Sequence, residues 1–381
     1  MGASMDRLQQ LHDAGQSIWL DFIDRTLLRS GELARRIEHD ALTGMTSNPT
    51  IFEKALAEGT AYDAQLAGAS PDLNAWELFE LIETDDVRAA CDIFRPVHEK
   101  SKGTDGYVSI EVSPGAAHDV EDTIAEARRL WAVVDRPNVM IKVPGTPQGA
   151  AATRRLLADG INVNITLLFS IDAHATIIES YLSALEERAS RGLPLSSISS
   201  VASFFVSRVD TEADKRLDAL VAANPARAEE AKALRGRVAV ANAKLAYALF
   251  RERFSGARWE ALAARGARVQ RPLWASTSTK NPAYRDVMYV EDLIGPDTVN
   301  TMPPATITAF ADHGVVERTV DAHLDQERAL IAKLEAFGVS LTGVTDTLLR
   351  DGLASFEKSF DTLIAGLEAK RRTLGATVGT R

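Results

Sequence analysis

The stretch NVMIKVPGTPQGAAATRRL, residues 138–156, decides the fold, because a buried strand, a tight turn and a helix follow one another within it. Residues 138–143 are mostly β-branched or aliphatic, which predicts a short strand. GTPQG has the composition of a turn, and the alanine-rich run from about Gly149 predicts a helix. Together they make half of a βαβ unit, in which helices cover the strand and leave little room for an idle charge such as Lys142.

Two interpretations of Lys142 compete on this evidence. In the first, the lysine lies at a strand end and extends its ammonium group to water, as lysines beside loops commonly do. In the second, a water-poor pocket favours the neutral amine, lowers the pKa and makes the lysine a nucleophile for a carbonyl carbon.

Strand-like runs alternate with longer amphipathic helical runs along most of the chain. Such alternation is typical of a parallel sheet, and eight repeats favour a closed (β/α)8 TIM barrel over an open sheet. The candidate strands are residues 17–22, 42–48, 107–112, 138–143, 162–168, 200–206, 269–276 and 297–302.

Three helical segments exceed a minimal barrel. We expect one α/β domain over 1–381 with its barrel core at about 16–314, because a barrel alone uses about 250 residues. The tail ends in an amphipathic helix that could pack on the barrel or on a second copy in a homodimer, followed by residues that we expect to fray. The additional segments are helical excursions at about 51–102 and 211–265 and the helical tail at 315–381.

The amino-acid composition indicates whether the chain is a soluble, membrane or secreted protein. The chain is 45% hydrophobic and 25% charged, as in soluble globular proteins, and has no apolar run of the ~20 residues that a membrane span needs. Its amino terminus lacks the apolar core of a secretory signal. Cys91 is the single cysteine and His174 one of seven scattered histidines; we interpret both as structural. These features predict a cytoplasmic protein.

The net charge and the sequence motifs restrict the ligands and cofactors that we expect. A net charge of −10 disfavours nucleic acid as a partner but permits a local basic pocket for a phosphorylated metabolite. The histidines have no metal-site spacing, and the chain has neither GxGxxG nor GxxxxGK[ST]. We therefore expect neither a bound metal nor a cofactor.

Side-chain alternation predicts what fills the barrel. Along 17–22, 107–112, 138–143 and 162–168, one face of each strand is aliphatic and the other carries polar residues. Val163, Ile165 and Leu167, for example, share the aliphatic face of the 162–168 strand. The helices need the aliphatic faces, so the polar ones should point into the barrel near the strand ends where barrel enzymes carry their active sites. The predicted interior polar residues are Asp21, Glu111, Lys142, Asn164 and Thr166.

A lysine among interior carboxylates suggests a specific chemistry and favours the second interpretation of Lys142. A neutral lysine condenses with a ketone to an iminium, which accepts electrons as a neighbouring C–C bond breaks without a metal, while carboxylates move the protons. This pattern is that of Schiff-base aldol chemistry in general and leaves the substrate open.

Six ordered motifs carry a family resemblance. They resemble transaldolase, in the family's order and from about residue 17 to beyond 304, and the length and PGTPQG resemble the longer bacterial form. The motifs are TSNPTIF (46–52), SIEVSP (109–114), VMIKVPGT (139–146), INVNITLLFS (161–170), SFFVSR (203–208) and STSTKNPAY (276–284).

The resemblance implies an enzyme of the pentose phosphate pathway that needs no cofactor. It would transfer a dihydroxyacetone unit from sedoheptulose 7-phosphate to glyceraldehyde 3-phosphate, giving erythrose 4-phosphate and fructose 6-phosphate. By motif position, Lys142 resembles the Schiff-base lysine and Asp21 the general acid/base. Glu111 and Thr166 resemble the pair that holds the water used in carbinolamine chemistry.

The remaining roles also follow from the resemblance. Asn48, Asn164 and Ser203 resemble residues that hold the dihydroxyacetone portion, while Arg208 and Lys280 resemble a phosphate clamp. Many family members have arginine where this chain has Lys280, which binds phosphate as a point charge without a bidentate fork. Without the resemblance, Asn48 could serve only the local backbone, and Ser203 and its neighbour Phe205 only packing.

Other functions stay open at this stage. The first alternative is an aldolase that releases free dihydroxyacetone from fructose 6-phosphate or acts on another phosphosugar. The second is a barrel that binds sugar phosphates without turnover.

Overall fold

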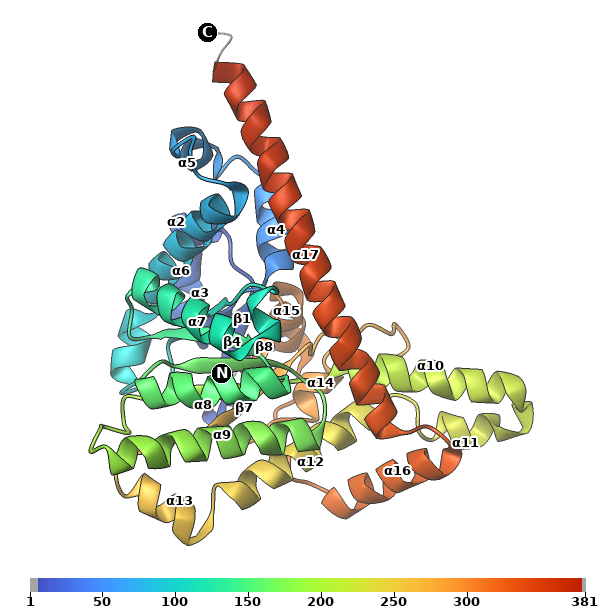
Figure 1. The fold of residues 1–381 in the computed structure, drawn as a ribbon. Helices are drawn as coiled ribbons and strands as arrows, with labels where there is room; N and C mark the ends of the chain where they lie inside the picture. Colours follow the sequence, from blue (N-terminus) through green and yellow to red (C-terminus); the bar gives the residue numbers. More distant parts are fainter. Residues whose placement is uncertain (1–5, 379–381) are drawn as a thin grey trace, which may run out of the picture.

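The computed structural model describes residues 6–378 and contains a closed barrel of eight parallel strands in sequential order (Figure 1). The predicted barrel is confirmed, and each expected strand is present within two residues of its predicted bounds. The strands are β1 (Gln16–Asp21), β2 (Leu42–Thr46), β3 (Tyr107–Glu111), β4 (Val139–Pro144), β5 (Val163–Leu168), β6 (Ser200–Phe205), β7 (Arg271–Ala275) and β8 (Thr298–Met302).

Side-chain alternation sorts the barrel into two apolar clusters. One cluster joins the outward strand residues, such as Ile110, Ile141 and Ile165, to the surrounding helices. The other is small and contains Trp19 and Met140, on the same strand faces as Asp21 and Lys142. Apolar residues therefore fill the middle of the barrel and polar ones occupy its carboxyl end, as the parity of the strands predicted.

Helices cover the outside of the barrel (Figure 1). Thr146 caps α8 by accepting from the Gly149 amide at 3.0 Å, and Pro147 takes the first helical position. The helix therefore begins at Pro147, two residues before Gly149, and takes in the last three residues of the predicted GTPQG turn. The helices outside the three additional segments are α1 (Arg7–Asp13), α2 (Arg25–Arg29), α3 (Glu32–His39), the 3₁₀ turn η1 (Ala116–His118), α7 (Val120–Val134), α8 (Pro147–Asp159), α9 (Ile171–Ser190), α14 (Met288–Glu291) and α15 (Pro304–His313).

The first excursion lies between β2 and β3. It contains α4 (Pro49–Glu58), α5 (Asp63–Gly68) and α6 (Ala75–Lys100), and it begins two residues before the predicted start because Asn48 caps α4. At the start of α6, Asn74 and Glu77 form a reciprocal capping box.

The second excursion lies between β6 and β7, and its α10–α11 part projects away from the barrel (Figure 1). Its first helix starts at Ser207, four residues before the predicted position. The elements are α10 (Ser207–Ala223), the 3₁₀ turn η2 (Pro225–Arg227), α11 (Ala228–Lys232), α12 (Val238–Arg253) and α13 (Gly256–Ala263).

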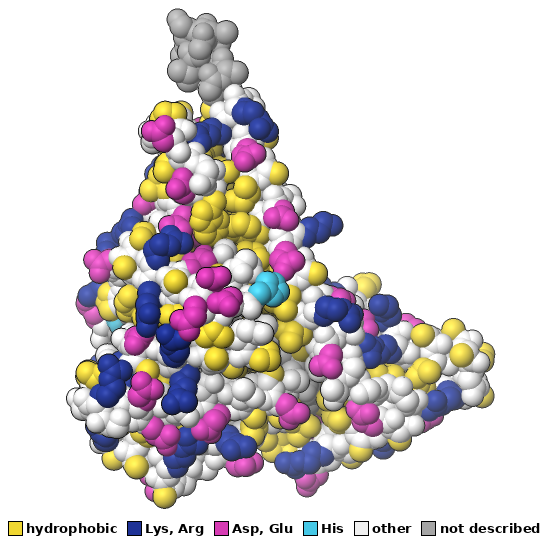
Figure 2. Space-filling model, viewed as in Figure 1, with side chains coloured by type: hydrophobic (Ala, Val, Ile, Leu, Met, Phe, Trp, Pro, Cys, Tyr) yellow, Lys and Arg dark blue, Asp and Glu magenta, His cyan; other side chains and the backbone are white. Residues whose placement is uncertain are grey.

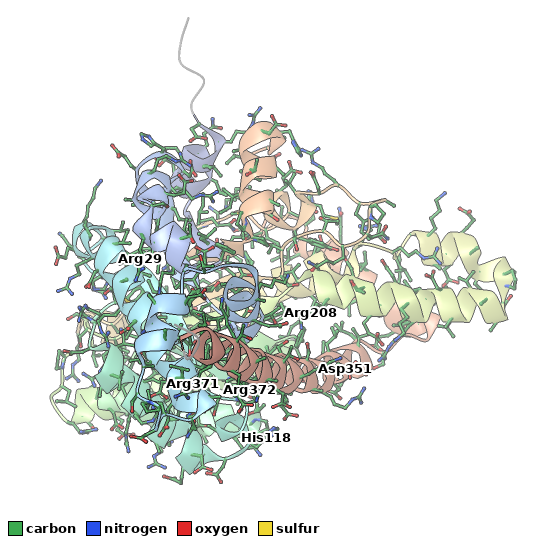
Figure 3. All side chains as sticks on the ribbon, turned by 90° about the horizontal axis from the view of Figure 1, so that it is seen from above. Arg29, His118, Arg208, Asp351, Arg371 and Arg372 are labelled. Carbon is green, nitrogen blue, oxygen red and sulfur yellow. The ribbon has the colours of Figure 1, made fainter. Side chains whose placement is uncertain are left out.

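The tail forms α16 (Leu324–Phe337) and the long helix α17 (Leu341–Val378), which crosses the carboxyl end of the barrel (Figures 1 and 3). It packs against α4, α5, α6 and α10. Thr50 donates to Ser359 at 3.0 Å, and Lys370 forms an ion pair with Asp63 at 3.0 Å. Fraying was predicted after residue 374, but α17 continues to Val378, and only residues 379–381 lie outside the described part of the chain.

The face shown in Figure 2 carries basic and acidic side chains interspersed, without a continuous basic surface. Within residues 6–378, no helix is both long and apolar enough to cross a membrane.

Candidate active site

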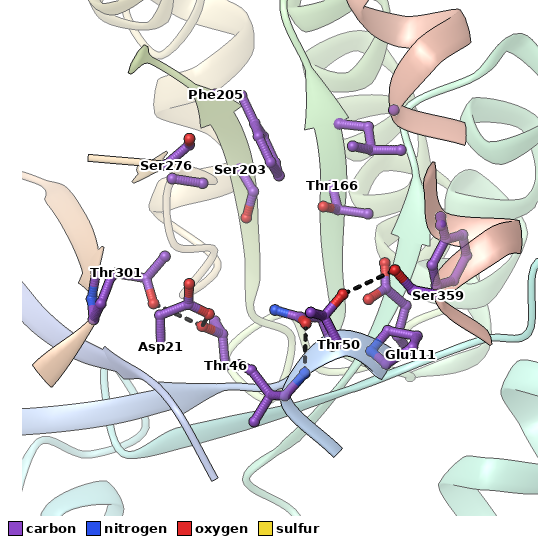
Figure 4. A pocket seen from close by; sticks show the side chains of 18 of the residues that line it. Asp21, Thr46, Thr50, Glu111, Thr166, Ser203, Phe205, Ser276, Thr301 and Ser359 are labelled. Atoms are coloured by element: carbon purple, nitrogen blue, oxygen red, sulfur yellow. Dashed lines mark hydrogen bonds between the residues drawn. The ribbon is translucent and has the colours of Figure 1, made fainter. Parts of the chain in front are cut away.

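A cavity of about 510 Å³ opens at the carboxyl end of the barrel (Figure 4). Most of the residues predicted for the site line it, and they come from seven of the eight strands or the segments after them. Those residues are Asp21, Asn48, Glu111, Lys142, Thr166, Ser203, Arg208 and Lys280.

Lys142 is enclosed at the bottom of this cavity, with 7% of its surface exposed. Its Nζ donates to Glu111 Oε2 and to the Ser47 carbonyl oxygen, both at 3.1 Å. The strand register puts Lys142 directly beside Glu111 of β3 and Asn164 of β5. The lysine therefore does not extend to bulk water, and a carboxylate adjoins the amine.

Asp21 ends β1 and faces the same cavity. Its Oδ1 accepts from the Thr46 hydroxyl at 3.0 Å, and Thr46 lies 2.7 Å from the Thr301 hydroxyl. Burial raises the pKa of Asp21 above 3.8, and the opposing effects of Lys142 and the Thr46 hydrogen bond do not cancel it. A carboxyl group held this way is better suited to exchanging protons near neutral pH than an exposed aspartate.

The pKa of Glu111 is shifted in the same direction as that of Asp21. Burial raises its pKa above 4.5 despite the adjacent Lys142. Glu83, on α6, is a second buried acid nearby, and burial followed by the charge of Glu111 raises its pKa well above 4.5. Both acids therefore hold a proton more readily than exposed glutamates do, which limits the negative charge around Lys142.

Thr166 lines the cavity next to Leu167, which corrects the parity prediction for Leu167. The β5–β6 register shifts between Ile165 and Leu168, and Leu167 has a φ of 58°. This irregularity interrupts the alternation, so two consecutive side chains face the cavity. A positive φ in a leucine is strained and persists only where surrounding packing holds it.

Asn48 lines the cavity, whereas Asn164 does not. Asn48 Oδ1 accepts from the Ile51 amide at 3.1 Å and so caps α4, and Asn48 also lines the cavity. Asn164 is fully buried and absent from the lining, with its amide donating to Ser109 at 2.9 Å. Its oxygen accepts from Ser203 at 2.6 Å, so Asn164 meets the cavity through Ser203.

Besides Lys142, three basic side chains line the cavity: Lys54, Arg208 and Lys280, of which the last two were predicted. Arg208 lies in the first turn of α10, where that helix leaves the barrel (Figure 3), and its guanidinium lies 5.2 Å from the centroid of the Phe205 ring. Lys280, in the loop after β7, donates to Ser278 at 2.7 Å. Within residues 6–378, neither Arg208 nor Lys280 forms an ion pair, although the charge of Asp21 acts on both, so each can still pair with an anionic ligand. Phe205 lines the cavity as well and is not solely a core residue.

Part of the cavity wall consists of residues that neither the motifs nor the strand alternation predicted. Thr46 and Thr301 line it, and so do four residues of α17, which lie more than 180 residues beyond Lys142 in the sequence. A turn-forming motif marks Thr46, but no local pattern marks α17, because only tertiary packing brings it to the barrel. The α17 residues are Gly352, Ser355, Phe356 and Ser359.

His174 and Cys91 occupy apolar surroundings. His174 is fully buried, and burial lowers its pKa to about 4, which keeps the ring neutral. Cys91 is fully buried in the main core and lies outside the cavity lining. Both positions agree with a structural role.

Comparisons with known proteins agree with this geometry. The family model described as Transaldolase/Fructose-6-phosphate aldolase matches residues 18–367. A protein named Transaldolase from Thermobifida fusca (strain YX) is 52% identical, covering 94% of this chain and 96% of the relative. Transaldolase 2 from Nostoc sp. (strain PCC 7120) is 47% identical, covering 97% and 99%. Transaldolase from Mycobacterium ulcerans (strain Agy99) is 48% identical, covering 97% and 98%. The chain therefore belongs to the transaldolase/fructose-6-phosphate aldolase family.

Proposed function

We propose that this protein is a cytoplasmic transaldolase of the non-oxidative pentose phosphate pathway. It transfers a dihydroxyacetone unit from sedoheptulose 7-phosphate to glyceraldehyde 3-phosphate through a Schiff base on Lys142. Erythrose 4-phosphate and fructose 6-phosphate are the products. The observation that carries the proposal is the enclosed Lys142, 3.1 Å from Glu111, in one cavity with Asp21, Arg208 and Lys280.

The first step is the condensation of Lys142 with the ketone. Glu111 takes a proton from the ammonium group, and the neutral Nζ attacks C2 of the ketose to form the C–N bond. The protonated Glu111 gives its proton to the carbonyl oxygen and takes one from Nζ, which forms the carbinolamine. Glu111 then gives that proton to the hydroxyl, so that water leaves and an iminium remains. The contact between Lys142 and Glu111 supports this assignment, and Thr166, in the same cavity, helps to hold that water.

Carbon–carbon cleavage is assigned to Asp21. Its carboxylate removes the proton of the C4 hydroxyl, the C3–C4 bond breaks, and its electron pair moves into the iminium to give an enamine on Lys142. Erythrose 4-phosphate leaves. When glyceraldehyde 3-phosphate binds, the enamine carbon attacks its aldehyde and Asp21 returns the proton to the new hydroxyl. Hydrolysis then frees fructose 6-phosphate and regenerates Lys142.

The remaining polar residues hold the substrate. Asn48 donates its side-chain NH₂ group to the dihydroxyacetone portion, and Ser203 binds the same portion with Asn164 fixing its orientation. Arg208 and Lys280 bind the phosphate group. An arginine beside the first turn of a helix is a favourable phosphate site, because helix N–H groups add to its charge.

The test is a transfer assay with fructose 6-phosphate as donor, in the presence and absence of erythrose 4-phosphate. A transferase forms sedoheptulose 7-phosphate and glyceraldehyde 3-phosphate with the acceptor and releases little dihydroxyacetone without it. Equal rates of dihydroxyacetone release with and without the acceptor would identify an aldolase. The absence of both products would leave only sugar-phosphate binding.

A further inference from the structure

The loop that carries Lys280 connects β7 to α14 and spans residues 276–287. Arg208 is on a different element, the first turn of α10. A phosphate group that binds both cations requires the loop and the helix to keep a fixed separation, because a small displacement of either charge weakens the joint contact. The contacts between the loop and α10 therefore affect the clamp directly.

Two tyrosines fasten this loop region to α10. Tyr284 Oη donates to Asp214 Oδ2 at 2.6 Å, and Tyr289 Oη donates to Asp210 Oδ2 at 2.8 Å. The two aspartates are one helical turn apart on α10 and follow Arg208 in the sequence. The tyrosines likewise follow Lys280 in the sequence: Tyr284 lies near the end of the loop and Tyr289 in α14.

A third segment completes the arrangement. The second oxygens of the two aspartates accept from backbone amides before and at the start of α12: Ala239 N to Asp210 Oδ1 at 2.8 Å, and Gly236 N to Asp214 Oδ1 at 3.2 Å. Gly236 has a φ of 68°, and a Cβ there would lie 2.7 Å from the Tyr284 ring. The backbone at Gly236 thus leaves the space that the ring occupies.

Burying these aspartates costs free energy that a purely space-filling contact would not. Asp210 is 1% exposed, and burial raises its pKa to about 7. Two acids one turn apart on a helix repel each other when both are charged. Apolar side chains of similar volume would pack here without these free-energy costs. What the aspartates and tyrosines provide in addition is directional hydrogen bonds.

We propose that Asp210, Asp214, Tyr284 and Tyr289 are positioning residues that fix the Lys280 loop relative to Arg208 and so set the affinity for the phosphate end of the substrate. We call this set the clamp latch. The inference rests on the proposed function in that the ligand is a sugar phosphate, but the latch is defined by affinity for phosphate and not by turnover.

The test uses the full-length variants Tyr284→Phe and Tyr289→Phe, each of which removes one hydroxyl and keeps the ring. We expect KM for fructose 6-phosphate and the dissociation constant of inorganic phosphate, measured by calorimetry, to rise about tenfold. We expect kcat within about twofold of wild type and unchanged borohydride trapping with unphosphorylated fructose, because neither depends on the clamp.

Tyr181→Phe is the matched control. Tyr181 is fully buried, and its hydroxyl donates to the Arg268 carbonyl at 2.7 Å, before β7 begins. This control loses one buried hydroxyl without affecting the loop, so its stability should fall while its phosphate affinity stays at the wild-type value. Tyr284 is only half-buried, so Tyr284→Phe remains a folded test even if Tyr289→Phe does not fold.

The outcomes separate the two proposals. Phosphate affinity in Tyr284→Phe equal to that of wild type and of Tyr181→Phe would overturn the latch, whatever the effect on stability. Absence of transfer by the wild type would instead refute the proposed function, and the calorimetric measurement with inorganic phosphate would still test the latch.

Discussion

Replacing Asp21 with asparagine tests the acid–base assignment without emptying the site. Asparagine has nearly the same shape, and its Oδ1 can still accept the 3.0 Å hydrogen bond from Thr46. The change removes only the ability to exchange a proton and the negative charge. Glu111 is the other carboxylate among the cavity-lining residues, and it is engaged by Lys142, so it cannot substitute for Asp21.

The size of the effect follows from this arrangement. General acid–base catalysis by a positioned side chain contributes about 10²- to 10⁴-fold, or about 3 to 5 kcal/mol at 1.36 kcal/mol per factor of ten. Because Glu111, the other cavity-lining carboxylate, is engaged by Lys142, we expect kcat for transfer to fall by about 10³-fold. The iminium should still form, because Lys142 and Glu111 are unchanged.

The assay combines transfer kinetics with borohydride trapping of the Asp21→Asn variant on fructose 6-phosphate. We expect slow transfer together with a trapped adduct near the wild-type yield. Asp24→Asn is the matched control, because Asp24 only caps α2, accepting from the Leu27 amide at 2.6 Å. Loss of the adduct in Asp21→Asn, or transfer at the rate of Asp24→Asn, would refute the reasoning.

Three further predictions concern separate parts of the molecule. Arg208→Ala should raise KM for phosphorylated substrates by about 10- to 100-fold with a smaller change in kcat, since one charge-assisted contact is lost; an unchanged KM would contradict the clamp. Burial raises the pKa of Asp210 to about 7. The folded protein therefore keeps a proton that the unfolded chain loses above about pH 4, and the free energy of unfolding falls as the pH rises from there to about 7. Asp210→Asn should reduce this fall by up to about 3 kcal/mol between about pH 5 and pH 8 in denaturant unfolding; an identical slope would contradict it. Asn74→Ala removes the capping box with Glu77 and should lower the free energy of unfolding by about 1 kcal/mol without changing KM, as chemical denaturation and kinetics would report.

The sequence predicted the barrel and the inward direction of its central polar residues, because both depend on local periodicity. Alternation along single strands is enough to assign Asp21, Glu111 and Lys142 to the interior, since a closed barrel with helices outside has only one place for polar faces. The position of Lys142 beside Glu111 then follows from strand order, because β3 and β4 are neighbours.

The remaining features depend on contacts that no local pattern encodes. Leu167 reaches the cavity because of an irregularity in β5, and alternation places it on the opposite face. Asn164 has the predicted inward direction, yet Ser203 and Ser109 occupy its hydrogen-bonding groups below the cavity surface. The α17 wall depends on the path of a helix more than 180 residues after Lys142.

The most direct test of the central claim is borohydride trapping with fructose 6-phosphate, followed by peptide mass spectrometry of the modified chain. We predict one stable adduct, carried by Lys142 and absent from the Lys142→Ala variant, which should stay folded because it loses the charge of an enclosed ammonium group. An adduct on another residue, or one that persists at wild-type yield in Lys142→Ala, would contradict the account.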